Sequence, residues 1–177
     1  ASGAASVVGS LTWNEAGAVC SLIEPPRRTE RVGLPTEAMW EYAARAGTTT
    51  RYSFGDRETA LDEHAWFVDN ATEAMAAATR PRQTLGLHDI HGNLREWVSD
   101  SYTADLRRAQ VSRPAPSLST QLTADRSQTE YVVRGGGWRD SARGVRSASR
   151  APASSGSTEG DIGFRCATLP PGVSSPP

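Results

Sequence analysis

The stretch GLHDIHGNLREWVSD, residues 86–100, points more directly to a fold than any other part of the chain. Gly92 and Asn93 form a residue pair that favours a tight turn, because both tolerate a left-handed backbone. The segment after them carries Trp97 and Val98 among polar residues, a pattern that favours a β-strand. We therefore expect a tight turn that leads into an aromatic-bearing strand.

A helix is expected well before this strand, in TWNEAGAVCSLI, residues 12–23. Thr12 is a suitable N-cap, and Glu15 occupies the capping-box position three residues later. The face expected to be apolar repeats with helical spacing and consists of Ala16, Val19, Cys20 and Ile23.

A second helix is expected in LPTEAMWEYAARAG, residues 34–47. Thr36 is its N-cap, Gly47 ends it, and Trp40, Ala43 and Ala44 share one face. The two helices are predicted to pack as a pair.

Two further strands are predicted, in EYVVRGGGW (130–138) and IGFRCA (162–167). The residues between them, 139–161, are mostly Ser, Ala, Gly and Arg and are expected to form an exposed loop. Residues 47–86 show no sustained period and are expected to be ordered loop, and residues 101–129 a polar connector. The pattern predicts an α+β domain with few strands.

Composition bounds the class of protein. The chain has 177 residues, a formal net charge of −1 and a pI near 6.4. This balance gives no overall basic field to attract nucleic acid, and no apolar run is long enough to span a bilayer. We expect one domain over residues 1–168 followed by a flexible tail, 169–177, with no nucleic-acid partner and no membrane span.

The chain has only two cysteines, Cys20 and Cys166, which lie far apart in the sequence. This spacing excludes a zinc knuckle and a C-x-x-C redox motif. Either the two residues meet in space or both are buried thiols.

Several blocks together resemble the formylglycine-generating enzyme (sulfatase-modifying factor) family. They are, in order, LTWNEAGAVC, GLPTEAMWEYAARAG, YSFGD, GLHDIHGNLREWVSD, VVRGGGW, RSASR and IGFRCA. The resemblance covers residues 7–167 and implies a C-type-lectin-like α+β fold with two helices, short antiparallel sheets and much irregular loop. The strands that usually precede the first helix in this family are missing. The chain is therefore a fragment, a minimal member, or a protein whose partner chain supplies those strands.

The resemblance also bears on catalysis. Family enzymes oxidise a substrate cysteine with copper held by a C-x4-C pair, and the RSASR block places Ala142 and Ser147 at those positions. Neither residue offers the soft thiolate that copper(I) requires, so no copper and no oxidase activity are expected. Iron-dependent members of the family need paired histidines, whereas His64, His88 and His91 form no such pair. We interpret His91 as a structural histidine of the turn.

A calcium site is expected in DIHGNLRE, residues 89–96. The Gly-Asn turn can direct carbonyl oxygens toward the carboxylates of Asp89 and Glu96, and hard oxygen ligands suit calcium. The resemblance implies a structural calcium bound by those two side chains and by the carbonyls of Gly92 and Leu94. The alternative is that Asp89 caps the turn and Glu96 pairs with an arginine.

The resemblance further matches Cys20 and Cys166 to positions that form a disulfide in some family members. Such a bond would favour an oxidising, extracytoplasmic compartment. The alternative is a pair of neighbouring buried thiols in a cytoplasmic protein.

The family's active-site surface corresponds to residues 138–162. Arginines there can make forked hydrogen bonds to carboxylates, and small neighbours leave space for a ligand. The candidate ligand-facing residues are Trp138, Arg139, Asp140, Ser141, Arg143, Gly144, Ser149 and Arg150.

We therefore expect a non-catalytic module that binds a protein or small-molecule ligand. The alternatives are a copper oxidase whose metal ligands lie elsewhere and a structural subunit of a larger assembly. The same segment also resembles the variable region of diversity-generating retroelement proteins, which is rich in Ser, Gly, Ala, Asp and Arg. A GC-rich genome would give the same composition.

Overall fold

The computed structural model describes residues 7–105 and 129–170, and in it the first helix, α1 (Trp13–Ser21), begins where its cap predicts. The capping box is confirmed: Thr12 Oγ1 accepts from Glu15 N–H at 3.3 Å, and Glu15 Oε2 accepts from Thr12 N–H at 2.8 Å. The predicted apolar face is only half correct. Val19 and Ile23 are exposed, because the face that meets the sheet is formed by Trp13, Ala16 and Cys20.

The second helix, α2 (Glu37–Arg45), also begins at its predicted cap, where Thr36 Oγ1 accepts from Met39 N–H at 3.2 Å. It ends one residue earlier than expected, because Ala46 itself adopts the left-handed conformation with φ 48°. Trp40 and Ala44 are buried, so this helix presents the predicted face to the core, although Ala43 is only half-buried.

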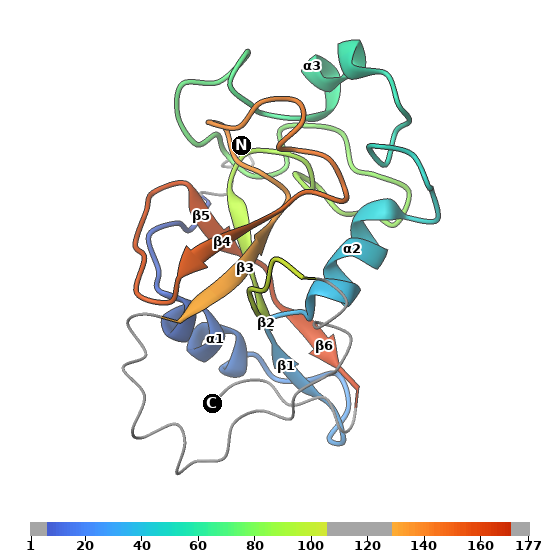
Figure 1. Ribbon diagram of the computed structural model, residues 1–177. Helices are drawn as coiled ribbons and strands as arrows, with labels where there is room; N and C mark the ends of the chain where they lie inside the picture. The colour runs from blue at the N-terminus through green and yellow to red at the C-terminus, as the bar shows by residue number, and fades with distance from the viewer. Residues whose placement is uncertain (1–6, 106–128, 171–177) are drawn as a thin grey trace, which may run out of the picture.

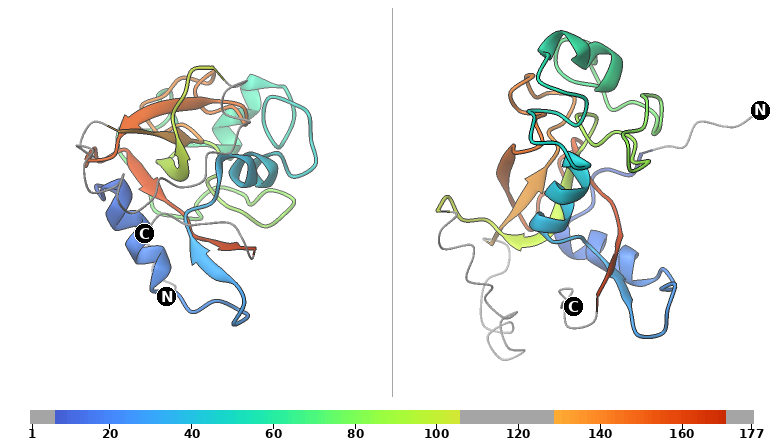
Figure 2. Two further views of the ribbon diagram at one scale, coloured as in Figure 1. Left: turned by 60° about the horizontal axis from the view of Figure 1, so that its bottom comes forward. Right: turned by 90° about the vertical axis from the view of Figure 1, so that its right-hand side faces the viewer.

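The main sheet has four strands in the order β4 (Arg150–Ser154), β3 (Glu130–Arg134), β2 (Arg95–Ser101), β5 (Ile162–Phe164). β3 pairs antiparallel with β2 and with β4, but β2 and β5 are parallel, so the sheet is mixed and not purely antiparallel. A separate antiparallel pair joins β1 (Arg31–Gly33) to β6 (Ala167–Leu169). α1 and the β1–β6 pair lie at one end of the molecule, and a short helix, α3 (Leu61–His64), lies at the other (Figures 1 and 2).

Several elements differ from the sequence-based expectation. The presumed loop 139–161 contains β4, and β3 ends at Arg134, which leaves the three glycines as a turn. The predicted strand 162–167 is divided into β5 and β6. Residues 47–86 contain α3 and a preceding 3-10 turn, Glu58–Ala60.

The largest core cluster lies between α1 and the sheet and includes Trp13, Leu34, Trp97 and Ile162. Cys20 belongs to this cluster and is joined by a disulfide to Cys166. The disulfide alternative is therefore confirmed. Because Cys166 lies between β5 and β6, the bond ties the first helix to the last strands.

The outer edge of β5 is met by the segment that leads into α1, since Ser10 N–H donates to the Ile162 carbonyl at 3.2 Å. A partner chain that supplies the missing strands stays a prediction. No helix in residues 7–105 or 129–170 has the length and apolar character to cross a bilayer. The tail predicted from residue 169 begins too early, because Leu169 is buried and ends β6. Residues 171–177 of that tail and most of the predicted connector fall outside the described residues.

Candidate functional site

The candidate surface is built on a turn-rich segment, residues 138–149, which we call the display loop. It begins after Gly135 and Gly136, both of which have positive φ. A Cβ at Gly136 would lie 2.7 Å from the Gly144 carbonyl oxygen, so only glycine allows the loop to return this closely on its own start.

A small apolar cluster anchors the display loop to the 52–67 region. Ala142 and Val145 are buried against Tyr52, Leu61 and other residues of the 52–67 region. Tyr52 Oη donates to the Ala142 carbonyl at 2.9 Å, and Ser147 N–H donates to the carbonyl of Arg51 at 2.9 Å. The loop is irregular in shape but is fixed at several points along its length.

A buried arginine supports the other end of the loop. Arg134 is 1% exposed and donates to the carbonyls of Ser147 (3.0 Å) and Ser149. Its guanidinium also pairs with Glu41 and lies 3.6 Å from Glu37, both on α2. The base of the display loop is thus connected to α2 through one buried cation.

Two of the predicted ligand-facing residues are engaged inside the protein. Both Asp140 oxygens accept from Arg95, at 2.9 and 3.1 Å. Burial alone would raise the pKa of Asp140, but the bonds from Arg95 and from Gly137 N–H bring it below its ordinary value. Arg150 is a β4 residue and makes two 2.7 Å bonds to Glu37. Asp140 and Arg150 therefore hold the scaffold together and are not free to meet a ligand.

The remaining candidates divide by exposure. Arg139, Ser141 and Arg143 are exposed, while Trp138, Gly144 and Ser149 are half-buried. Arg139 lies over the Trp138 ring at 4.5 Å, a distance suited to a cation–π contact. Within the described residues, neither Arg139 nor Arg143 forms an ion pair through its side chain. The loop therefore exposes two uncompensated positive charges.

The positions matched to the copper cysteines are both interior. Ala142 is 6% exposed and Ser147 is fully buried. The chain's two cysteines are joined to each other, and α1, which carries Cys20, lies at the opposite end of the molecule from the display loop (Figure 1). No thiolate pair is therefore available at this surface in the disulfide-bonded chain.

Three of the predicted calcium ligands, Asp89, Gly92 and Leu94, lie in the turn before β2, and the fourth, Glu96, is the second residue of β2. Asp89 Oδ2 accepts from Ala78 N–H at 2.7 Å, while its Oδ1 is buried without a hydrogen-bond partner among the described residues. Burial raises the pKa of Asp89. An orphaned buried carboxylate oxygen is what a cation site would provide.

Glu96 fits a cation less well. Its Oε2 accepts from Trp40 Nε1 and from Arg165 Nε, each at 2.6 Å, and its Oε1 accepts from Arg165 as well. Calcium would have to share Glu96 with Arg165. Within the described part of the chain, no group of three or more His, Cys, Asp or Glu side chains is placed to hold a metal, although a site built from two carboxylates and two carbonyls needs no such group.

The structure brings together a Ser–His pair that the sequence did not reveal. Ser53 Oγ lies 3.0 Å from His91 Nε2, and His91 Nδ1 donates to the Val145 carbonyl at 2.8 Å. However, His91 Nε2 already accepts from Ser53 N–H at 3.0 Å, and burial lowers the pKa of His91 to about 4. An imidazole with so low a pKa is a weak base at neutral pH, which supports a structural role for His91.

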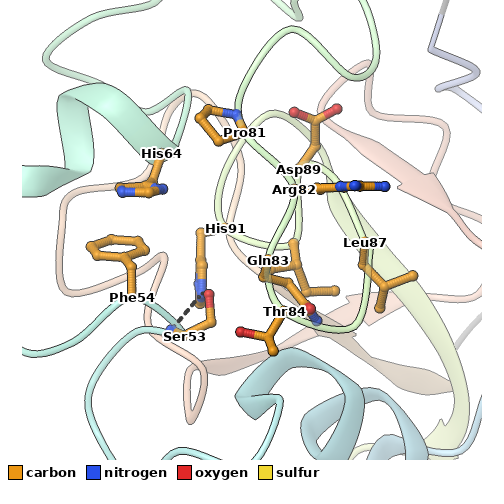
Figure 3. A pocket seen from close by; sticks show the side chains of 11 residues that line it. Ser53, Phe54, His64, Pro81, Arg82, Gln83, Thr84, Leu87, Asp89 and His91 are labelled. Carbon is orange, nitrogen blue, oxygen red and sulfur yellow. Dashed lines mark hydrogen bonds between the residues drawn. The ribbon is translucent and has the colours of Figure 1, made fainter.

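Beside this pair lies a cavity of about 200 Å³ (Figure 3). Its walls come from two segments distant in sequence, 53–64 and 81–91, and include Phe54, His64 and Arg82. Sequence reasoning missed this cavity because residues 47–86 carry no periodic pattern from which their contacts could be inferred.

Comparison with known proteins places the whole arrangement in context. Residues 3–169 match the sulfatase-modifying factor enzyme 1-like domain. Inactive C-alpha-formylglycine-generating enzyme 2 of Mus musculus is 30% identical over 174 residues, covering 89% of this chain and 47% of that protein. Formylglycine-generating enzyme of Mycobacterium tuberculosis is 31% identical over 152 residues, covering 77% of this chain and 51% of that protein. Because both identities are nearly equal, sequence similarity alone does not separate active from inactive relatives.

Variable protein 1 of Treponema denticola is structurally similar, with a TM-score of 0.63 and 29% identity over 77% of this chain and 47% of that one. Serine/threonine-protein kinase Pkn1 of Chlamydia trachomatis is 33% identical over 135 residues, covering 76% of this chain and 20% of that protein. The chain spans about half the length of the two formylglycine-type relatives.

Proposed function

Because the chain belongs to the sulfatase-modifying factor enzyme 1-like domain family, we propose that it is a non-catalytic binding module of that family. The display loop recognises the ligand, which is a partner with acidic groups. One observation carries this proposal. The loop is anchored by buried contacts and yet exposes Arg139 and Arg143, neither of which forms an ion pair with residues 7–105 or 129–170.

The chemistry of the exposed residues decides the class of partner. A guanidinium makes forked, charge-assisted hydrogen bonds to carboxylates, and the anchored backbone of the loop fixes the positions from which both side chains extend. Ser141, exposed between them, adds a small hydroxyl that can donate or accept. Ala142 and Ser147 stand at the positions matched to the copper cysteines, and the chain's two cysteines are joined to each other, which supports recognition without oxidation.

Replacing both Arg139 and Arg143 by glutamine is expected to weaken binding to a polyglutamate peptide about tenfold or more. The matched control is the double replacement of Arg28 and Arg57 by glutamine. It removes two other exposed arginines, so the two variants have the same net charge. Biolayer interferometry at low and at physiological salt measures both variants. Equal loss in the two variants would mean that only net charge matters, and no preference of the unmodified chain for polyglutamate over polylysine would exclude an acidic partner.

A structural calcium is a further proposal for the turn before β2. Asp89 and Glu96 would supply carboxylate oxygens and Gly92 and Leu94 their carbonyls. Calcium there would stabilise the turn that places His91 beneath the display loop. The orphaned Oδ1 of Asp89 supports this proposal, and the Arg165 bonds to Glu96 weigh against it.

Calcium at about 5 mM is expected to raise the Tm by about 2–4 °C, given an affinity near 1 mM. Asp89→Asn keeps the oxygen that accepts from Ala78 N–H but removes the charge, so the calcium-dependent shift should vanish in this variant. Differential scanning calorimetry with EDTA and magnesium controls measures the effect. An identical Tm in calcium and in EDTA would rule out the site.

A second candidate function is a diversified binding protein of the retroelement type. The structural similarity to variable protein 1 of Treponema denticola favours it, together with the Ser-, Gly- and Arg-rich composition of residues 139–161. A near-identical template repeat and a reverse-transcriptase gene beside the coding sequence are expected in that case. If genome sequencing finds neither, this candidate fails while the simpler binding module stands.

A further inference from the structure

The cavity described above is separate from the outward side chains of the display loop. It lies between the 81–87 segment and the aromatic pair Phe54 and His64 (Figure 3). At about 200 Å³ it is smaller than the roughly 300 Å³ at which drug-sized sites begin. Its ligand is therefore a small molecule and not a peptide.

One wall of the cavity is a stacked aromatic surface. The Phe54 ring lies 4.2 Å from the His64 ring, with an interplanar angle of 11°. It also stacks on the nearly parallel Tyr52 ring, with 5.1 Å between the ring centroids. His91 stands edge-on to Phe54 at 5.6 Å. Since Tyr52 and His91 are buried and hydrogen-bonded, this wall is preformed and suits a planar, apolar body.

The free charge at the cavity is positive. Arg82 lines it and, across residues 7–105 and 129–170, takes part in no ion pair. Asp89 also lines it and one of its oxygens accepts from Ala78 N–H, but burial raises the pKa of this carboxyl more than that bond, His88 and Arg165 lower it. An incoming anion therefore meets the exposed, uncommitted guanidinium of Arg82, whereas Asp89, whose Oδ1 is buried, is the lining carboxylate that a cation would meet instead.

Uncommitted polar groups complete the lining. The His64 imidazole stacks on Phe54, and no hydrogen bond from it to another described residue is formed; the same holds for the Thr84 hydroxyl. Ser53 Oγ is shared with His91. The His64 imidazole and the Thr84 hydroxyl can each donate to a carboxylate oxygen beside Arg82, whereas the Ser53 hydroxyl donates to His91 Nε2.

We propose that this cavity binds a small carboxylate with a planar apolar body, of about the size of benzoate. The body lies against the Phe54 wall, and the carboxylate accepts hydrogen bonds from Arg82, His64 and Thr84. The site is independent of the display loop's arginines, so it can fail or hold without affecting the proposed function.

The test is an NMR titration of the whole chain, labelled with ¹⁵N, using sodium benzoate as the probe up to about 20 mM. We expect saturable shifts of the amides of Ser53, Phe54 and residues 82–87, with a Kd of the order of 1 mM for so small a ligand. Benzamide, which has the same shape without the charge, should bind about tenfold more weakly.

Arg82→Gln should reduce benzoate affinity about tenfold. Arg82 is exposed, so this replacement leaves the fold intact, as an unchanged amide spectrum outside the cavity will show. Arg57→Gln, which replaces an exposed arginine that does not line the cavity, is the matched control and should bind within about twofold of the unmodified chain. Shifts that do not saturate, equal affinity for benzoate and benzamide, or an unaffected Arg82→Gln variant would each overturn the proposal.

Discussion

Arg134→Met is expected to lower the free energy of unfolding by about 3–5 kcal/mol, the usual loss when one partner of a buried ion pair is removed. The arginine is almost completely buried and donates to two carbonyls at the base of the display loop as well as to Glu41. Methionine fills much of the volume but donates no hydrogen bond. The carbonyls of Ser147 and Ser149 would then be left without this donor.

Urea unfolding followed by tryptophan fluorescence measures this loss. Arg27→Gln is the control, because Arg27 forms an exposed pair with Glu30 at 3.5 Å and its side chain is 79% exposed. Exposed pairs contribute about 0–1 kcal/mol, so this variant should remain close to the unmodified protein. A loss below about 1 kcal/mol in Arg134→Met would show that the buried cation does not stabilise the fold as described.

Removal of the disulfide by the double replacement of Cys20 and Cys166 with alanine is expected to lower stability by about 3–5 kcal/mol. The bond closes a loop with a sequence separation of 146 residues, and so long a loop restricts the unfolded chain strongly. Alanine avoids placing a hydroxyl in the apolar cluster that surrounds Cys20.

A thiol reductant provides the matched comparison. It should destabilise the unmodified chain by a similar amount and leave the double-alanine variant unchanged, as measured by urea unfolding with and without reductant. If reduction left the unmodified chain as stable as before, the bond would contribute nothing, and the link between α1 and the last strands would rest on packing alone.

The parts of the fold that the sequence predicts well are those with local physical causes. Thr12 and Thr36 cap their helices because a side-chain oxygen close in sequence satisfies a free N–H. The turn before β2 was predicted because Gly92 and Asn93 tolerate a left-handed backbone, and both have positive φ. β4 was missed because RAPAS contains a proline and small residues and shows no strand alternation. Its pairing with β3, and not its own composition, makes it a strand.

The candidate site shows the same division. The resemblance located the display loop, but it did not reveal which of its charges are free. Asp140 pairs with Arg95 and Arg150 pairs with Glu37, partners distant in sequence that only the folded chain brings together. The cavity beside Phe54 depends on contacts of the same long-range kind.

The central claim is that this member of the family binds without transforming its ligand. The most direct measurement is anaerobic loading of the disulfide-bonded chain with copper(I), followed by incubation with a cysteine-containing peptide and oxygen. An active formylglycine-generating enzyme serves as the positive control. Metal analysis and mass spectrometry should find little copper on the chain and no aldehyde on the peptide. Stoichiometric copper together with turnover of the peptide would contradict the claim and identify the chain as an oxidase.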